Sequence, residues 1–239
     1  MNNPKISVIT VVYKDPDGLE RTINSVQEQV YNNLEHIIID GGSGQKTIDI
    51  IDKYKQKIDY WVSEPDSGIY DAMNKGIKVS TGKWLNFMNA GDIFYSDDAI
   101  EKVFAEEEFD AFSDKSLIYG YKYQDGKAVY PISIDFLNKG VIMACHQSMF
   151  FNFEYVKGEL FYDTRYPIYA DYELVNRLYM KFPDTFKEMN IPISIFEGGG
   201  ISSRPSKQKR IDKYTILYRH YGVWQLIKAI LFRVLHNGK

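Results

Sequence analysis

Acidic side chains follow several short apolar runs in the sequence. At such positions a carboxylate can contact a bound ligand that carries phosphate. Asp92 comes after the run at residues 84–88 and after the small pair Ala90-Gly91, which lets a bulky anion approach the backbone closely. A carboxylate in such a place suits Mg²⁺ or Mn²⁺, which bind through protein oxygens together with substrate phosphates. The structural alternative is an Asn-Ala-Gly-Asp turn that leads into a helix cap.

Asp40 and Asp171 are two further acids at positions where a segment begins or ends. Asp40 ends the run at residues 35–40 directly before two glycines, so it either accepts hydrogen bonds from a base or ribose or forms a common Asp-Gly turn. Asp171 opens an amphipathic segment at residues 169–182. Taken alone, an acid there favours the helix dipole and no more.

His146 and Gln147 lie between two apolar stretches, where a histidine is more often a hydrogen-bonded wall residue than a catalyst. The four histidines are scattered and there is one cysteine, so no zinc-type spacing exists. Residues 13–18, after the first apolar run, lack the G-x-G-x-x-G pattern of dinucleotide sites. These absences disfavour zinc, NAD and FAD.

The candidate residues are positioned by apolar runs that alternate with amphipathic stretches over the first hundred residues. The runs predict buried strands, and the stretches predict helices. Such alternation indicates an α/β fold with a mainly parallel, doubly wound sheet, in which ligands bind beyond the carboxyl ends of the strands. The expected strands are residues 5–13, 35–40, 59–63 and 84–88, and the expected helices are residues 16–30, 48–55 and 68–79.

The regularity weakens in the second half of the chain. An acidic helix is expected first, then a hairpin that turns through Gln124-Asp125-Gly126, a second helix and a short strand. The corresponding ranges are residues 99–108, 117–123 with 127–131, 169–182 and 192–196.

Length and composition describe one large globular domain, or one domain with a short appendage. The chain has 239 residues, 29 Lys+Arg, 32 Asp+Glu and a single cysteine, Cys145, which cannot form an internal disulfide. The sequence has no run of about 18 apolar residues and no signal-peptide pattern, so we expect a cytoplasmic protein.

The net charge of −3 is unevenly distributed. Residues 204–239 contain nine Lys/Arg and one acid, Asp212, and carry +8, which leaves −11 for residues 1–203. The acidic body disfavours nucleic acid as a partner. The basic segment predicts two helical pieces around Gly222 with interleaved aromatic and cationic residues. Such helices suit an anionic membrane surface, or they pack on the domain or form a homodimer.

Four segments follow one another at a characteristic spacing: residues 7–13, 38–43, 63–77 and 89–92. In this order they resemble bacterial family 2 glycosyltransferases with the GT-A fold. Residues 145–147, 170–174 and 199–202 are similar to later segments of that family, so the resemblance covers roughly residues 5 to 200.

The resemblance implies a division of the chain and a role for particular residues. A catalytic domain would span residues 1–203, with a nucleotide-sugar half to about residue 95 and an acceptor half after it, followed by the tail at residues 204–239. Asp92 would hold the divalent metal, and Asp171 would be the general base. His146 and Gln147 would lie on the acceptor side, and the donor contacts would be Thr10, Tyr13, Asp40, Asp66, Asn74 and Lys75.

The sequence departs from the family pattern at three places. Many members carry two or three acids in the metal segment, whereas Asn89 and Gly91 flank Asp92 here, which predicts weaker metal affinity. Residues 43–45 and Lys14 also differ from the usual residues, which affects fine contacts to the nucleotide.

The resemblance implies an inverting, metal-dependent transfer of a sugar from a UDP-linked donor to a hydroxyl of a saccharide or lipid-linked acceptor, in surface polysaccharide assembly. A diphosphate leaves as a stable anion, so a metal replaces the general acid and one base suffices. Two alternatives remain: a catalytically silent module that binds a sugar nucleotide or a lipid, and a sugar nucleotidyltransferase. The second needs a Gly- and Arg-rich loop after the first run, and residues 13–18 do not provide one.

Overall fold

A single mixed sheet runs through the molecule. The computed structural model describes residues 3–104, 112–198 and 206–236. Within these ranges nine strands form the sheet in the order β3-β2-β1-β4-β8-β6-β9-β5, with β7 paired to β6. The sheet therefore joins the first and second halves of the chain through the contact between β4 and β8.

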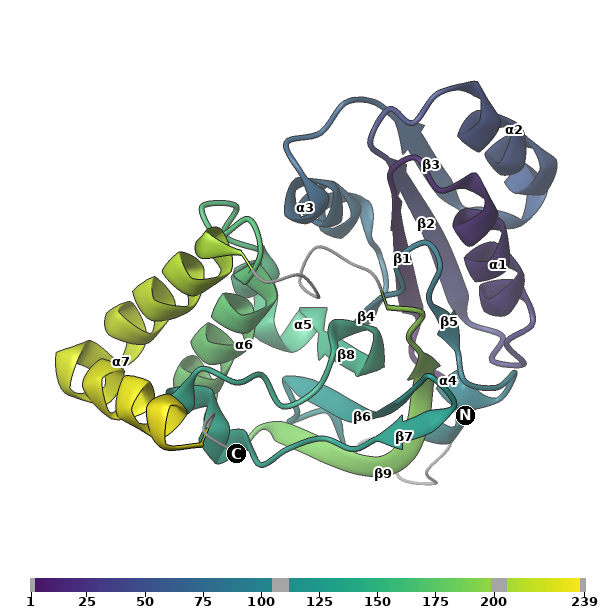
Figure 1. The fold of residues 1–239 in the computed structure, drawn as a ribbon. Helices are drawn as coiled ribbons and strands as arrows, with labels where there is room; N and C mark the ends of the chain where they lie inside the picture. The colour runs from purple at the N-terminus through teal and green to yellow at the C-terminus, as the bar shows by residue number, and fades with distance from the viewer. Residues whose placement is uncertain (1–2, 105–111, 199–205, 237–239) are drawn as a thin grey trace.

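The first half has the expected alternation of parallel strands and helices (Figure 1). Strand β1 pairs in parallel with β2 and β4, and β2 pairs in parallel with β3. The strands are β1 (Ile6–Val12), β2 (Leu34–Asp40), β3 (Tyr60–Ser63) and β4 (Trp84–Phe87). The helices are α1 (Pro16–Gln27), α2 (Gln45–Tyr54) and α3 (Ile69–Val79), with a 3₁₀ turn η1 (Lys55–Lys57) after α2.

Alternating side chains of β1 are buried on the two faces of the sheet. Ile9 and Val11 pack in the cluster that contains Met73 and Ile77 of α3, whereas Val12 packs with α1 on the opposite face. Figure 1 shows α3 on one side of these strands and α1 and α2 on the other. The first half is thus doubly wound, as predicted, and its strand ends converge at one edge.

The second half is not parallel throughout. Strand β8 runs antiparallel to β4 and β6, and β9 runs parallel to β6 but antiparallel to β5. The expected hairpin is confirmed as β6 and β7, whereas β9 begins six residues before the predicted strand at residue 192. The strands are β5 (Ile93–Phe94), β6 (Leu117–Gln124), β7 (Lys127–Val129), β8 (Met149–Asn152) and β9 (Phe186–Ile195).

The helices of this half pack on both faces of the sheet, in two different core clusters. The acidic helix is α4, and the part predicted beyond residue 104 lies outside the described residues. The helices are α4 (Ala99–Phe104), α5 (Phe153–Val156) and α6 (Ala170–Lys181), and the 3₁₀ turns are η3 (Ile134–Lys139), η4 (His146–Ser148) and η5 (Lys157–Leu160).

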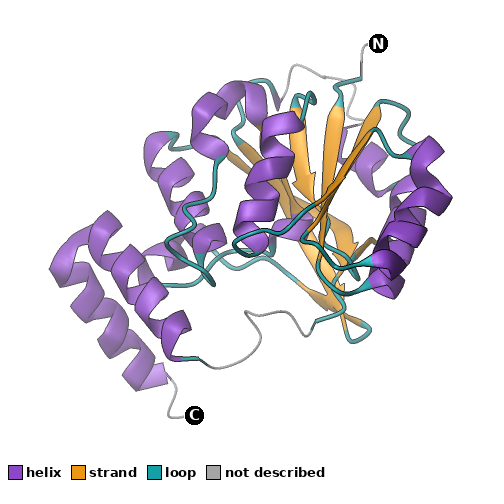
Figure 2. Ribbon diagram, turned by 90° about the horizontal axis from the view of Figure 1, so that it is seen from above, coloured by secondary structure: helices purple, strands orange, loops and turns teal. Residues whose placement is uncertain are grey.

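The C-terminal segment forms α7 (Lys207–His236), which breaks at Gly222 with φ 79° and ψ 176°. The two pieces predicted around Gly222 are confirmed, and Figure 2 shows them as two helical arms at the edge of the molecule, apart from the sheet. Ile216 and Leu217 are fully buried and belong to the same cluster as Leu174 of α6. The arms therefore pack on the second half, whereas the predicted domain boundary at residue 203 lies outside the described residues.

Candidate active site

A cavity of about 390 Å³ lies beyond the carboxyl ends of β1 and β4, where the topology of the sheet predicts a ligand. The end of β1, the loop after β4, the turn η4, the start of α6 and the segment after β9 all contribute to its walls. Its polar lining residues are Tyr13, Asp15, Tyr70, Asn89, Asp92, His146, Gln147, Asp171 and Glu197.

A second cavity, of about 530 Å³, adjoins the first on the side of β6, β7 and α6. Most of its outer wall is apolar, with Lys122 and Lys209 among the apolar side chains. The apolar residues of this wall are Val129, Ile132, Val141, Ile142 and Met143. The residues shared by the two cavities are His146, Gln147, Ile168, Asp171 and Phe196.

Asp171 lies where the two cavities meet, on the first turn of α6. Its Oδ1 accepts hydrogen bonds from the backbone N–H of Tyr172, at 2.7 Å, and from the hydroxyl of Tyr70, at 3.3 Å. The Oδ2 atom lies 3.9 Å from Nδ1 of His146, and 21% of the side chain is exposed. One carboxylate thus faces both cavities and keeps an oxygen available for a proton.

His146 connects Asp171 to the loop after β4. The Nδ2 amide group of Asn89 lies 2.9 Å from Nε2 of His146. An amide nitrogen only donates hydrogen bonds, so Nε2 accepts, and the neutral ring carries its proton on Nδ1. That N–H group is on the side of Asp171.

Asp92 is almost completely buried, with 6% of its surface exposed. Its Oδ2 accepts a hydrogen bond from Nε2 of Gln147 at 2.6 Å, and its Oδ1 accepts one from the backbone N–H of Glu197 at 3.1 Å. Burial raises the pKa of Asp92, although these two hydrogen bonds oppose the shift. A cation beside the carboxylate would reverse this penalty.

The oxygens around Asp92 fit a hard divalent cation. Oδ1 of Asn89 and Oε1 of Gln147 are buried and have no hydrogen-bond partner, and both side chains line the first cavity together with Asp92. Carboxylate and amide oxygens are the ligand types that Mg²⁺ and Mn²⁺ take. The part of the chain that the structure describes has no cluster of three or more His, Cys, Asp or Glu for a metal. Phosphate and water would therefore complete the coordination.

Tyr13 and Asp66, both predicted to contact the donor, lie near the first cavity. Tyr13 lines the first cavity and is 62% exposed. Asp66 accepts a hydrogen bond from the N–H of Gly68 at 2.8 Å and packs so closely on Gly41 that a Cβ there would overlap its Oδ2 atom. Asp66 is not part of the cavity lining but supports the loop beside Tyr13.

Asp40 and Thr10 are fully buried and do not line the cavity. Asp40 accepts hydrogen bonds from the hydroxyl groups of Ser43 and Ser63, the latter at 2.6 Å, and so joins the loops after β2 and β3. Thr10 contacts Nε2 of His36 at 3.0 Å inside the first half. Both side chains have partners within the protein.

Asn74 and Lys75 brace neighbouring segments. The amide of Asn74 makes hydrogen bonds with both the carbonyl and the N–H of Tyr162, at 2.9 and 2.8 Å. Lys75 forms an ion pair with Glu64 at 2.7 Å and donates to the carbonyl of Pro65 at 3.1 Å. Of the six predicted donor residues, Tyr13 alone is part of the cavity lining, and a direct donor contact by any of the six stays a prediction.

Four polar lining residues were not in the predicted site: Asp15, Tyr70, Asn89 and Glu197. Asp15 follows β1 and caps α1 by accepting the N–H of Gly18 at 2.9 Å, so its place after a strand end could have indicated it. Tyr70 lies within the predicted third helix. Glu197 forms an ion pair with Arg21 at 2.7 Å, 176 residues away, and no local pattern marks it.

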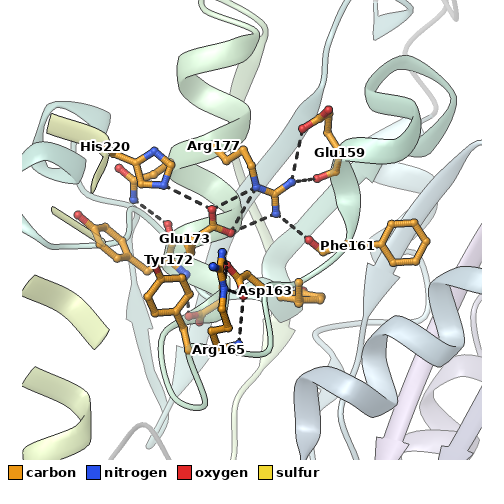
Figure 3. A network of polar contacts seen from close by, with 12 residues as sticks. Glu159, Phe161, Asp163, Arg165, Tyr172, Glu173, Arg177 and His220 are labelled. Carbon is orange, nitrogen blue, oxygen red and sulfur yellow. Dashed lines mark hydrogen bonds and ion pairs between the residues drawn. The ribbon is translucent and has the colours of Figure 1, made fainter. Parts of the chain in front are cut away.

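A network of ion pairs fixes α6 behind the cavity (Figure 3). Glu173, 6% exposed, contacts Arg177 at 3.1 Å and His220 of α7 at 3.4 Å. Burial raises the pKa of Glu173, but these two partners bring it below its usual value. Arg177 also donates to the carbonyl groups of Glu159 and Phe161. The helix that carries Asp171 is thus tied to both α7 and the segment around η5.

Comparison with known proteins identifies relatives. The family model of glycosyl transferase family 2 matches residues 7–164. An uncharacterised glycosyltransferase of Mycobacterium tuberculosis is 35% identical over 181 residues, which cover 73% of this chain and 68% of the relative.

Solved structures with the same fold include S. aureus TarS in complex with UDP, with a TM-score of 0.69 and 13% identity. The match covers 90% of this chain and 65% of the TarS chain, so this chain spans less than two thirds of that protein. Glucosyl-3-phosphoglycerate synthase from Mycobacterium tuberculosis, in complex with Mn²⁺ and UDP, has a TM-score of 0.63 and 14% identity over 91% of this chain and 80% of that one. These likenesses confirm the fold expected from the sequence.

Proposed function

Because the chain belongs to glycosyl transferase family 2, we propose that it transfers a sugar from a UDP-linked donor to a hydroxyl of a saccharide or lipid-linked acceptor, with inversion at the anomeric carbon. The observation that carries this proposal is the meeting of two cavities at Asp171. The first cavity, with Tyr13 and Asp92, has the polar groups for a nucleotide diphosphate. The second, with apolar walls, is the acceptor side.

Asp171 is the general base of the proposed reaction. Its carboxylate accepts the proton of the acceptor hydroxyl as that oxygen attacks the anomeric carbon, a role that contributes typically 10²–10⁴-fold to a rate. The hydroxyl of Tyr70 and Nδ1 of His146 lie beside this carboxylate, at 3.3 and 3.9 Å. A single displacement with one base inverts the anomeric configuration.

A divalent cation fits the groups around Asp92. Mn²⁺ or Mg²⁺ would be held by Asp92 with the amide oxygens of Asn89 and Gln147, and would neutralise the charge that develops on the leaving diphosphate. The hydrogen bond from Nε2 of Gln147 orients the Asp92 carboxylate. The N–H of Glu197 fixes its second oxygen.

The exposed face of α7 supports a place at the inner surface of a membrane. Arg210, Lys228 and Arg233 are exposed among apolar side chains, whereas the one acid, Asp212, is buried. Aromatic and apolar residues interleaved with cations suit anionic lipid, and a homodimer through this face would bring two cationic surfaces together. The exposed apolar residues are Ile211, Tyr218, Val223, Trp224, Ile227, Ile230, Leu231, Val234 and Leu235.

No helix of the described residues has the length and hydropathy to cross a bilayer. Peripheral binding is testable by sedimentation with phosphatidylglycerol vesicles. The double substitution Trp224→Ser with Leu235→Ser should release the protein, whereas Val30→Ser, an exposed apolar residue in the first half, should not. Equal sedimentation of all three proteins would contradict the membrane role.

A panel of nucleotide sugars tests the donor class. With Mn²⁺ present, UDP-sugars should raise the melting temperature, and CDP- and GDP-sugars should have little effect. UDP release should then depend on an added acceptor, such as a lipid-linked saccharide. Donor binding without UDP release for any acceptor would instead indicate a silent binding module.

A further inference from the structure

The C-terminal helical pair places one buried carboxylate against the segment that precedes α6. Asp212, the one acid among residues 204–239, is 2% exposed. Its Oδ2 accepts hydrogen bonds from the backbone N–H groups of Ile168, at 2.9 Å, and Tyr169, at 3.3 Å. Its Oδ1 accepts one from Nε2 of Gln208 at 2.6 Å. All three donors face a single side chain in a segment that is otherwise cationic.

The backbone groups that Asp212 binds lie directly before α6, whose second residue is Asp171. Tyr169 is the N-cap of α6, and its own side chain makes no capping hydrogen bond. Helix starts leave N–H groups that need an outside partner, and a carboxylate there is favoured by the helix dipole. Asp212 supplies this partner for the N–H of Tyr169 from 43 positions away, and it also binds the N–H of Ile168, which precedes the helix.

The same backbone is held from the other side by α3. The hydroxyl of Tyr70 donates to the carbonyl of Ile168 at 2.8 Å and lies 3.3 Å from Oδ1 of Asp171. Ile168 also lines both cavities. Residues 168 and 169 lie three and two positions before Asp171. They are therefore held between Tyr70 of α3 and Asp212 of α7.

We propose that Asp212 is a positioning residue for the transfer reaction: through the N–H groups of Ile168 and Tyr169 it sets where Asp171 stands between the two cavities. The inference rests on the proposed function of Asp171 as the base. It makes the helical pair a part of the active site, although the family match ends at residue 164.

The expected cost of losing Asp212 follows from geometry. Its removal leaves two N–H groups without their partner, and the segment before α6 can then shift. A misplacement of about 1 Å in a catalytic group is able to cost about 10²-fold in rate. The donor cavity beside β1 and β4 is built by other residues, so donor binding should be spared.

The test compares full-length Asp212→Ala and Asp212→Asn with the wild type. Asp212→Ala should lower kcat by about 10- to 100-fold with the KM for the UDP-sugar within about two-fold. Asp212→Asn keeps one acceptor oxygen for Ile168, so it should recover part of kcat. The matched control is Gln225→Ala, which removes a hydrogen bond from α7 to the carbonyl of Asn138 at 2.8 Å and should leave kcat unchanged.

Amide hydrogen exchange supplies a readout that does not depend on activity. Asp212→Ala should accelerate exchange in the peptide that covers residues 166–172, and Gln225→Ala should not. An active enzyme whose Asp212→Ala variant keeps its kcat, or a variant in which exchange at residues 166–172 is unchanged, would overturn the inference. A wild type that releases no UDP would instead refute the proposed function, and the exchange result would still decide whether Asp212 holds the segment.

Discussion

The loops at the ends of β2 and β3 are closed by partners close in sequence, whereas the segment that carries Asp171 is held by partners far away. Ser43, which binds Asp40, is three residues from it, and the N–H of Gly68 that binds Asp66 is two residues away. Asp171 depends on Tyr70 at a separation of 101 residues and, through Ile168, on Asp212. The loops after β2 and β3 thus have local closures, whereas the base side, like the carboxylate of Asp92, is held by partners from distant segments.

The largest expected effect on kcat comes from a substitution of the proposed base, Asp171. Asp171→Asn removes the proton acceptor but preserves shape, so kcat should fall by at least about 10³-fold while UDP-sugar affinity stays within about two-fold. Turnover assays and calorimetric titration of the same preparation check both numbers. Equal turnover in the variant would remove Asp171 from the role of base.

A substitution on the donor side should instead lower the affinity for the UDP-sugar. Asp92→Ala removes the carboxylate proposed to hold the cation, so UDP-sugar affinity in Mn²⁺ should fall by at least about 10- to 100-fold, because even the hydrogen-bond partners of metal ligands have effects of this size. Titrations with and without Mn²⁺ check the prediction. A wild type whose donor binding ignores metal would contradict the assignment of Asp92.

The free energy of unfolding should depend on pH through His36, a buried residue of the donor half. Catalysis should not change with it. Burial lowers the pKa of His36 to about 4 from its usual 6.5. Below pH 6.5 the unfolded chain binds a proton that the folded chain rejects, so the free energy of unfolding falls as the pH decreases towards 4. At pH 5 this loss amounts to about 2 kcal/mol.

The His36→Gln variant isolates this contribution. Denaturant unfolding at pH 7 and pH 5 should show a pH dependence that is smaller by about 2 kcal/mol than in the wild type. An unchanged pH dependence would mean that His36 is not the titrating group. A changed KM for the donor would show that the buried pair of Thr10 and His36 influences the nucleotide site after all.

The smallest effect is expected at the residue that joins the two sides. Tyr70→Phe removes one hydrogen bond to the carbonyl of Ile168 and one to Asp171, and should lower kcat by about 3- to 10-fold, as for a loss of about 1 kcal/mol. Steady-state kinetics check this value. An effect on donor KM alone would place Tyr70 on the donor side rather than between the two.

The fold of the first half could be predicted because its signals are periodic and local. The β-branched runs and the helical spacing of residues such as Ile23 and Ile77 identify elements without knowledge of their partners. Strand β9 was predicted too short, because residues from Phe186 to Ile191 are mostly exposed or half-buried and show no apolar run. The antiparallel insertion of β8 beside β4 likewise has no local signal.

The residues of the site likewise divide into those that a local sequence signal predicts and those that have none. The positions of Tyr13, Asp92 and Asp171 at the cavity could be predicted, because these residues follow strand ends or lie at a helix start. Their partners could not, because Glu197 and Asp212 approach from more than 40 residues away. The single acid in the basic tail was visible in the sequence, but only the fold shows that it faces the backbone before Asp171.

The anomeric configuration of the first product tests the account most directly. One base at the junction of two cavities allows a single displacement, so an α-linked UDP-sugar should give a β-linked product and an equal amount of UDP. The proton NMR spectrum of the reaction mixture, recorded during the first turnovers, reports both. An α-linked product would contradict the single displacement and the role of Asp171 as its base.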